Sequence, residues 1–198
     1  DAAAELHPTG LPTRVARLRL DTTPGGLAAM LQGQAWPGLR GLSVTLPARN
    51  ARMYRRKPVD YSFTKADVEA LASAGFLSQL DELELTGVLG EDLAEVLVTA
   101  LVRAKPKLER LCLNASELGN DALEQLADAG LLADLEVLEL YRCRLKAKGF
   151  TLLLGAQGPT RLTRLVLAKN AATAPTTTAL AAWPGLSSVT RLDLREVT

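Results

Sequence analysis

The chain has 198 residues, of which 47% are hydrophobic and 23% are charged, and its formal net charge is +1. This is the composition of a globular protein that is long enough to bury a core without disulfides or metals. A net charge near zero gives no electrostatic reason to expect nucleic acid as the partner. The only histidine is His7, which excludes His-dependent triads and multi-histidine metal sites. We therefore predict no cofactor and no metal.

The cysteines and the apolar runs indicate the compartment. Cys112 and Cys143 are too few for a disulfide framework, so we expect two reduced thiols in a cytoplasmic protein. No apolar run is long enough to span a bilayer and no leader is visible, so we predict no membrane insertion and no signal peptide. The first residue is Asp1 rather than Met, so we expect a processed or recombinant fragment. Richness in Ala, Leu and Arg favours a bacterial source.

Seven short segments share one pattern: apolar, two free positions, apolar, one free position, apolar. They span 15–20, 39–44, 80–85, 108–113, 135–140, 162–167 and 189–194. The alternation within each segment predicts a strand with one face buried. The middle leucines are Leu18, Leu42, Leu83, Leu111, Leu138, Leu165 and Leu192. The last three steps between them are 27 residues each, which indicates an internal repeat.

Amphipathic stretches lie between these segments. Thr64 with Asp67 three residues later predicts a capping box that opens a helix through Leu71. Helical spacing of apolar residues predicts further helices over 93–101, over 121–127 with Gly130 as its stop, and over 150–154. The small, polar segment 171–178 predicts a loop before a last helix. One strand and one helix per unit cannot bury their apolar faces alone, so we expect the units to stack as a solenoid.

At these residues the chain resembles the leucine-rich repeat family, in its ribonuclease-inhibitor-like type with 27–28-residue repeats. The resemblance covers nearly the whole chain, 1–198, as a single domain of about seven repeats. It implies an α/β, curved leucine-rich-repeat solenoid, with a parallel β-sheet on the concave face and helices on the convex face. It specifies the architecture and says almost nothing about activity.

The turn after each strand departs from the family pattern. Members of the family often place Asn or Cys three residues after the last strand leucine, where the side chain hydrogen-bonds the turn backbone. The residues here are Thr23, Pro47, Val88, Ser116, Cys143, Asn170 and Val197. Only Cys143 and Asn170 match, although Thr23 and Ser116 can substitute. We expect less regular turns and looser curvature at Pro47 and Val88.

The second repeat contains an irregular basic insertion, 47–63. Insertions in solenoids map to loops on one face, which is often the binding face. As a recognition loop it would bind an acidic protein, phosphate or nucleic acid; as an ordinary solvated loop its Tyr54, Tyr61 and Phe63 would attach it to the scaffold. The candidate binding residues of this rim loop are Arg49, Arg52, Tyr54, Arg55 and Arg56.

The positions between the strand leucines face away from the helices. In the middle repeats these positions, and those just before them, are rich in acid: Asp81, Glu82, Glu84, Glu109, Glu136 and Glu139. Like charges on adjacent strands repel unless they are compensated, which Arg110 and Arg142 could provide in part. The residues form either a binding patch for a basic partner, with Tyr141 as an aromatic contact, or an ordinary hydrophilic sheet face.

Cysteines and tryptophans give weaker signals. Cys112 is expected on the exposed sheet face, but no histidine is available to activate it and acidic neighbours would raise its pKa. Cys143 is expected to point inward at a turn, and we predict no disulfide. The tetrapeptide Trp-Pro-Gly-Leu occurs at 36–39 and again at 183–186. Its tryptophans are either interface anchors or parts of a helix-to-strand turn, which we favour.

These features predict a protein–protein interaction module, not an enzyme, that binds a partner protein through its concave face and the rim loop 47–63. The partner is expected to have a basic surface. A sensor segment of a larger signalling protein and a GTPase-activating-type regulator are the alternatives, and nucleic acid is unlikely as a partner. The sequence does not define the oligomeric state, although an exposed terminal strand at 189–194 would permit edge-to-edge dimerisation.

Overall fold

A computed structural model of the chain describes residues 15–33, 35–46, 62–155 and 158–197. These residues form an α/β fold in which strands and helices alternate and seven strands make one sheet in the order of the chain. Every neighbouring pair of strands is parallel. The strands are β1 (Arg17–Asp21), β2 (Gly41–Thr45), β3 (Glu82–Leu89), β4 (Arg110–Ser116), β5 (Val137–Glu139), β6 (Arg164–Val166) and β7 (Arg191–Asp193).

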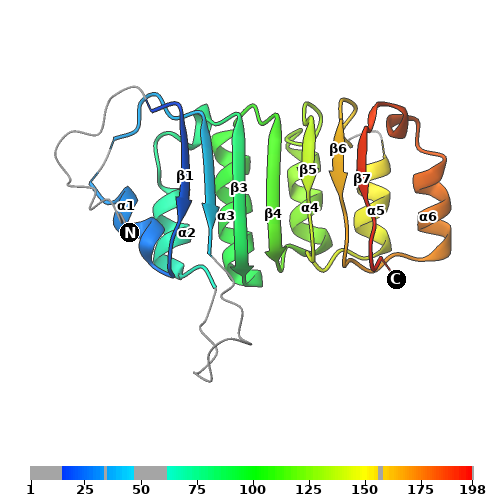
Figure 1. Cartoon of the computed structure of the whole chain (residues 1–198), viewed down its shortest axis with the longest axis horizontal. Helices are drawn as coiled ribbons and strands as arrows, with labels where there is room; N and C mark the ends of the chain where they lie inside the picture. Colours follow the sequence, from blue (N-terminus) through cyan, green and yellow to red (C-terminus); the bar gives the residue numbers. More distant parts are fainter. Residues whose placement is uncertain (1–14, 34, 47–61, 156–157, 198) are drawn as a thin grey trace, which may run out of the picture.

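The helices of the described residues lie on one face of this sheet, behind the strands in Figure 1. They are α1 (Gly26–Leu31), α2 (Lys65–Ala72), α3 (Glu91–Ala104), α4 (Gly119–Asp128), α5 (Ala147–Leu154) and α6 (Ala174–Ala181), with short 3₁₀ helices η1 (Leu77–Gln79) and η2 (Pro184–Ser188). This arrangement is consistent with the solenoid-like repeat fold that the sequence predicts. None of these helices is long and apolar enough to cross a membrane.

The seven middle leucines lie side by side across the sheet. The strand register pairs each of them with the next, from Leu18 to Leu192. In the interior strands they are almost fully buried, with Leu83, Leu111 and Leu138 at 0% exposure. Their side chains point toward the helices and join one hydrophobic core that runs along the sheet. The register holds even where the spacing is irregular, since Leu42 lies 24 residues after Leu18 and 41 residues before Leu83, so burial of the leucine face sets the register.

Asp67 links the first two helices. Its carboxylate accepts hydrogen bonds from the backbone N–H and hydroxyl of Thr64, which completes the capping box at the start of α2. The same carboxylate accepts from the N–H groups of Gly25 (2.8 Å) and Ala28 (2.9 Å) at the start of α1. Burial of the carboxyl raises its pKa, but the bonds from Ala28, Thr64 and Gly25 outweigh burial and hold the pKa below its ordinary value.

Polar side chains link the turns after β4, β5 and β6. The Asn170 Oδ1 accepts from the N–H groups of Cys143 (2.9 Å) and Leu145 (3.1 Å), and its Nδ2 donates to the Leu140 carbonyl (2.7 Å). Cys143 points inward, is fully buried, and donates its thiol to the Leu113 carbonyl of the preceding unit. Both cysteines are free thiols, so the expected absence of a disulfide is confirmed.

Several sequence-based boundaries were wrong. The segment 171–178 was expected to be a loop, but α6 begins at Ala174, because Pro175 fits the first turn of a helix and the hydroxyls of Thr173 and Thr176 lie 2.8 Å apart. Strands β5, β6 and β7 have three residues each, where six were expected. The irregularity expected at Val88 is present: the register of β3 shifts between Thr86 and Leu89. Pro47 lies outside the described residues.

Candidate functional site

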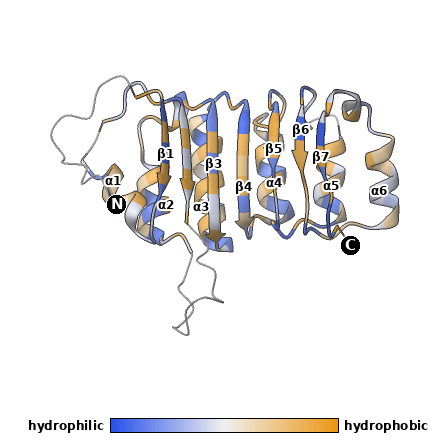
Figure 2. Cartoon of the chain, in the orientation of Figure 1, coloured by the Kyte–Doolittle hydropathy of each residue, from blue (hydrophilic) through white to orange (hydrophobic). Residues whose placement is uncertain are grey.

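The sheet face opposite the helices, here called the open face, is built from two rows of side chains. One row runs through Arg17, Gly41, Glu82, Arg110, Val137, Arg164 and Arg191, and the other through Arg19, Ser43, Glu84, Cys112, Glu139, Val166 and Asp193. Figure 2 shows hydrophilic colour along the strands, interrupted by apolar positions. In these rows the register places predicted acidic residues on β3 (Glu82 and Glu84) and on β5 (Glu139), with β4 between them.

Three of the predicted acidic residues form ion pairs with arginines. Arg17 on β1 donates two hydrogen bonds to Glu82 on β3, of 3.0 and 3.1 Å. Arg161 Nη2 lies 3.2 Å from Glu136 Oε1. Arg164 Nε lies 2.6 Å from Glu139 Oε1, without the alignment of a hydrogen bond. Compensation was expected from Arg110 and Arg142, but no ion pair of either residue is found in the described part of the chain, and other arginines supply it.

The remaining three acidic residues are Asp81, Glu84 and Glu109, here called the central acidic patch. Among the described residues, none of their carboxylates forms an ion pair or a side-chain hydrogen bond, and the Asp81 Oδ1 is buried without a hydrogen-bond partner. Asp81 directly precedes β3 and Glu109 directly precedes β4. The two residues are neighbours, because the Glu109 N–H donates to the Asp81 carbonyl over 2.8 Å. This part of the sheet therefore has negative charge that no side chain of the described residues pairs.

A shallow hollow of about 190 Å³ lies on the open face over β1–β3. Gly41 and Ser43 on β2 form its small-residue floor, with Arg17 and Arg19 of β1 on one side. Glu82 and Glu84 of β3, and Arg110 of β4 beyond them, line the other side. A Cβ on Gly41 would lie 2.9 Å from the Arg17 Cγ and 3.1 Å from the Glu82 Oε2. The glycine is therefore needed for the Arg17 side chain to reach across β2 to Glu82.

Cys112 lies at the expected position in the sheet, but its side chain is not exposed. Only 1% of the residue is accessible, and its register neighbours on the adjacent strands are the longer residues Glu84 and Glu139. Burial, followed by the charges of Glu139 and Glu84, raises the pKa of the Cys112 thiol to about 12. The expected direction of the pKa shift is confirmed, and the expected exposure was wrong. A buried thiol of such high pKa is not a nucleophile at neutral pH.

Tyr141 follows β5 at the edge of the open face and is half-buried. Its ring faces a cation, with the Lys169 Nζ 5.7 Å from the ring centroid. Its N–H donates to the Oδ1 of Asn114, whose Nδ2 donates weakly to Glu139 over 3.4 Å. The ring is held by a cation–π contact within the chain, and its role as a contact for a partner stays a prediction.

The candidate residues of the rim loop, Arg49, Arg52, Tyr54, Arg55 and Arg56, lie outside the described residues. The end of the insertion is described, and it is attached to the scaffold. Phe63 is buried in the core at 3% exposure, and its N–H donates to the Val88 carbonyl over 2.8 Å. Ser62 and Val88 form an isolated parallel bridge. The expectation that Phe63 attaches the loop to the fold is therefore confirmed.

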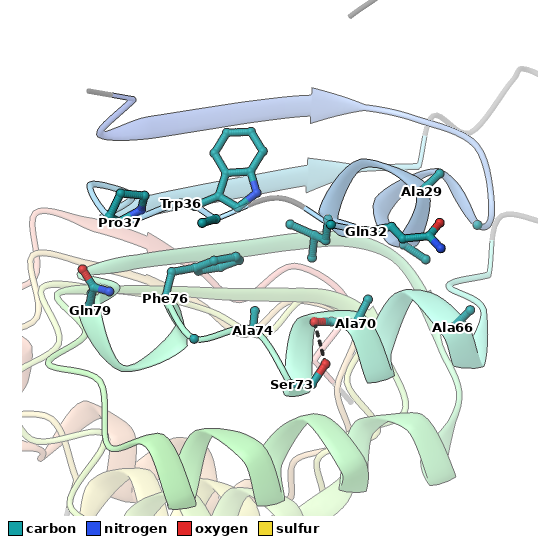
Figure 3. A pocket seen from close by; sticks show the side chains of 16 residues that line it. Ala29, Gln32, Trp36, Pro37, Ala66, Ala70, Ser73, Ala74, Phe76 and Gln79 are labelled. Carbon is teal, nitrogen blue, oxygen red and sulfur yellow. Dashed lines mark hydrogen bonds between the residues drawn. The ribbon is translucent and has the colours of Figure 1, made fainter. Parts of the chain in front are cut away.

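A larger hollow, of about 940 Å³, lies on the helix side between α1 and α2 (Figure 3). Small residues line it, among them Ala29, Ala66, Ala70 and Ala74, together with Trp36 and Phe76. Trp36 is 7% exposed, and the carbonyl of Trp36 accepts from the Leu39 N–H across a turn. This favours the turn interpretation of the repeated tetrapeptide over an interface anchor. Trp183, in the second copy of the tetrapeptide, directly precedes the 3₁₀ helix η2. Unlike Trp36, it is only half-buried.

Sequence reasoning missed the ion-paired arginines and the glycine floor. The aligned repeats already place Arg17, Gly41 and Glu82 at equivalent positions of three successive strands. The ion pair between Arg17 and Glu82 could not be predicted from this alignment alone, because it also depends on the conformation of the Arg17 side chain. No cluster of three or more metal-ligating side chains is found in the described part of the chain. No family model and no curated protein matches the chain.

Proposed function

We propose that the chain is a leucine-rich repeat protein of the ribonuclease-inhibitor-like type and that its open face binds a partner protein with a basic surface. Two features support the family: the 27-residue step that puts like leucines in register, and the buried Asn170 and Cys143 at the repeat turns. On this proposal the open face is the concave face of a curved solenoid, and the rim loop 47–63 borders it.

The observation that carries the binding proposal is the hollow over β1–β3 beside the central acidic patch. The Glu84 carboxylate lines the hollow and forms no ion pair among the described residues, whereas Glu82 beside it is held by Arg17. A lysine or arginine of a partner placed over Gly41 and Ser43 would supply the missing charge. Charge-assisted hydrogen bonds of this kind are about twice as strong as neutral ones.

The charges make the binding sensitive to salt and to position. Exposed charges are screened over about 8 Å at physiological ionic strength, so the association is expected to weaken as salt rises. The solenoid offers a preformed rigid surface, so partner binding needs little ordering of the scaffold. The sheet gives this surface its fixed geometry, because adjacent strands are about 4.8 Å apart.

The test reverses charge on the open face and, separately, on the helix side. Glu84→Lys with Glu109→Lys alters two unpaired carboxylates, and is preferred to changing Glu139, whose ion pair with Arg164 a reversal would break. Glu95→Lys with Asp128→Lys is the matched control, since it makes the same charge change on exposed positions of α3 and α4.

Proteins captured from a lysate of the source organism at low salt are compared between the two variants. We expect the open-face variant to lose specific partners by at least about tenfold, and the control to retain them, with both circular dichroism spectra unchanged. Capture that survives the open-face reversal, or that both variants lose equally, contradicts binding at the open face. Addition of an oligonucleotide at low salt tests nucleic acid separately, and we expect no binding.

A further inference from the structure

The hollow between α1 and α2 lies where the first helix stops short. α1 has six residues and α3 has fourteen, so at 1.5 Å per residue they extend over about 9 and 21 Å. After Leu31 the chain turns at Gly33, which has a φ of 70°, and returns toward β2. Residues 73–76, which follow α2, therefore line a hollow of about 940 Å³ instead of packing against a longer α1.

The residues that line this hollow are small and uncharged. Six alanines and three glycines are among them, and none of the described residues that line it is charged. In the chain as a whole 23% of the residues are charged. Ligand pockets usually measure about 300–1,000 Å³ and are lined mostly by apolar groups, and this hollow meets both conditions. A charged ligand would lose its hydration there without gaining a counter-charge.

Trp36 gives the hollow a hydrogen-bond donor without an acceptor. The residue is 7% exposed, and its Nε1 is buried without a hydrogen-bond partner in the described part of the chain. Figure 3 shows the rings of Trp36 and Phe76 at one end of the hollow, with the indole nitrogen on the side turned toward α1 and Gln32. Because Trp36 lines the hollow, a small rotation of its side chain presents the N–H to an atom placed there. Buried donors in native proteins almost always have a partner, so this N–H favours a ligand with an acceptor.

The second copy of the tetrapeptide Trp-Pro-Gly-Leu has no such donor. Trp183 lines a smaller hollow, of about 440 Å³, together with Gly185 of the same turn. It is half-buried, and its Nε1 is not a buried, unpaired donor. The two tryptophans therefore share a turn, but only Trp36 combines burial, a large hollow and an unpaired N–H.

We propose that the hollow between α1 and α2 binds a neutral, aromatic small molecule with one carbonyl group, which accepts a hydrogen bond from the Trp36 Nε1. The rings of Trp36 and Phe76 contact the aromatic part of the ligand, and the small side chains of α1 and α2 leave room for it. Asp67 makes an anion unfavourable, because its carboxylate bonds the N–H groups of Gly25 and Ala28, which line the hollow. The proposal concerns the helix side, so it does not depend on the binding proposed for the open face.

The first experiment compares three naphthalenes that differ in one group. 2-Acetylnaphthalene carries the carbonyl, 2-isopropenylnaphthalene has a CH₂ group in place of its oxygen, and 2-naphthoate is an anion. Equilibrium dialysis measures their affinities, and NMR follows the indole N–H signals of Trp36 and Trp183, the only two tryptophans. We expect the ketone to bind at least about fivefold more tightly than the alkene, which is the contribution of one hydrogen bond.

The ketone is also expected to shift the indole signal of Trp36 and to leave that of Trp183 in place. Equal affinities for the ketone and the alkene, or naphthoate that binds as tightly as the ketone, would overturn the proposal. Failure of all three compounds to bind would overturn it as well, since the hollow would then be covered by protein and not by a small molecule.

The second experiment fills the hollow. Ala70→Leu on α2 adds a bulky side chain to its wall, and Ala104→Leu at the end of α3 is the matched control, because both alanines are half-buried and Ala104 does not line the hollow. We expect Ala70→Leu to weaken binding of the ketone by at least about tenfold through steric clash, and the control to leave it unchanged. Circular dichroism confirms that both variants are folded. Equal affinities for the ketone in the two variants would place its site elsewhere.

The third experiment tests the donor itself. Trp36→Phe keeps an aromatic ring in the wall and removes the indole N–H, so we expect this variant to bind the ketone and the alkene equally. Trp183→Phe, the same change in the second copy of the tetrapeptide, is the control that retains the preference for the ketone. A Trp36→Phe variant that still prefers the ketone would show that another group bonds the carbonyl, and would refute the assignment to Trp36.

Discussion

The interior repeats and the last repeat contain the same leucine pattern but differ in how much of it they bury. Leu138 in β5 has a strand on each side and is fully buried, whereas Leu192 in β7 has, among the described residues, a strand on one side and is 41% exposed. The comparison shows that each unit buries its own leucines only in part and that the neighbouring unit completes the burial. In a solenoid of this kind stability is approximately a sum of unit and interface contributions.

The strongest test of this comparison shortens the same side chain in both places. Leu138→Ala is expected to cost about 3–4 kcal/mol of unfolding free energy, because it removes a buried side chain and leaves a cavity between two units. Leu192→Ala is expected to cost less than about 1.5 kcal/mol, since water and the remaining chain fill the space. Urea unfolding at low protein concentration measures both. Equal losses would mean that the two strands are buried alike.

The second test removes the polar link between repeat turns. Asn170→Ala leaves the N–H groups of Cys143 and Leu145 and the carbonyl of Leu140 without their partner. Unpartnered buried groups cost about 1–3 kcal/mol each, so for these three groups we expect a loss of at least about 3 kcal/mol. Asn114→Ala is the control, as its Oδ1 accepts only the Tyr141 N–H and the residue is half-buried; its expected cost is below about 1 kcal/mol. Similar costs for the two variants would show that burial of the Asn170 amide is unimportant.

The third test concerns the link at the other end of the sheet, where Asp67 caps α1 and α2. The folded-state pKa of Asp67 lies below its ordinary value of 3.8, so its stabilising contribution is present above pH 3.8 and is lost as the pH falls through the folded value. Asp67→Asn removes this contribution, and we expect a loss of about 1–2 kcal/mol at pH 7 that shrinks as the pH falls below 3.8 and through the folded-state pKa. Chemical unfolding at several pH values measures it. A loss that does not change with pH would exclude the carboxylate charge as the cause.

The sequence predicted the parts of this fold that depend on local pattern. The period places Leu83, Leu111 and Leu138 in register, and the spacing of Thr64 and Asp67 identifies the capping box. The sequence could not predict the side-chain contacts between neighbouring repeat units. The same carboxylate of Asp67 also reaches α1, 39 residues earlier in the chain, and no local pattern indicates that contact.

The candidate site shows the same limit. The acidic positions on the open face were predicted from alternation, but which of them stay unpaired depends on how far each arginine reaches. Arg17 reaches Glu82 only because Gly41 lies between them, while Glu84 is left without an ion pair among the described residues. Cys112 was expected to be exposed, but it is buried between strands that carry Glu84 and Glu139 at the same level. The alternation within one strand predicts which face a side chain lies on, but it does not predict how the side chains of adjacent strands pack around it.

Amide hydrogen exchange, read residue by residue, tests the completion of each unit by its neighbour most directly. Leu140 and Leu167 each donate an N–H to the following strand, and Leu194 is the equivalent residue without a described strand beyond it. We expect the Leu140 and Leu167 amides to exchange at least about a hundredfold more slowly than the Leu194 amide. Equal protection at all three, or a Leu140 amide that exchanges as fast as Leu194, would contradict the stacking of these repeats.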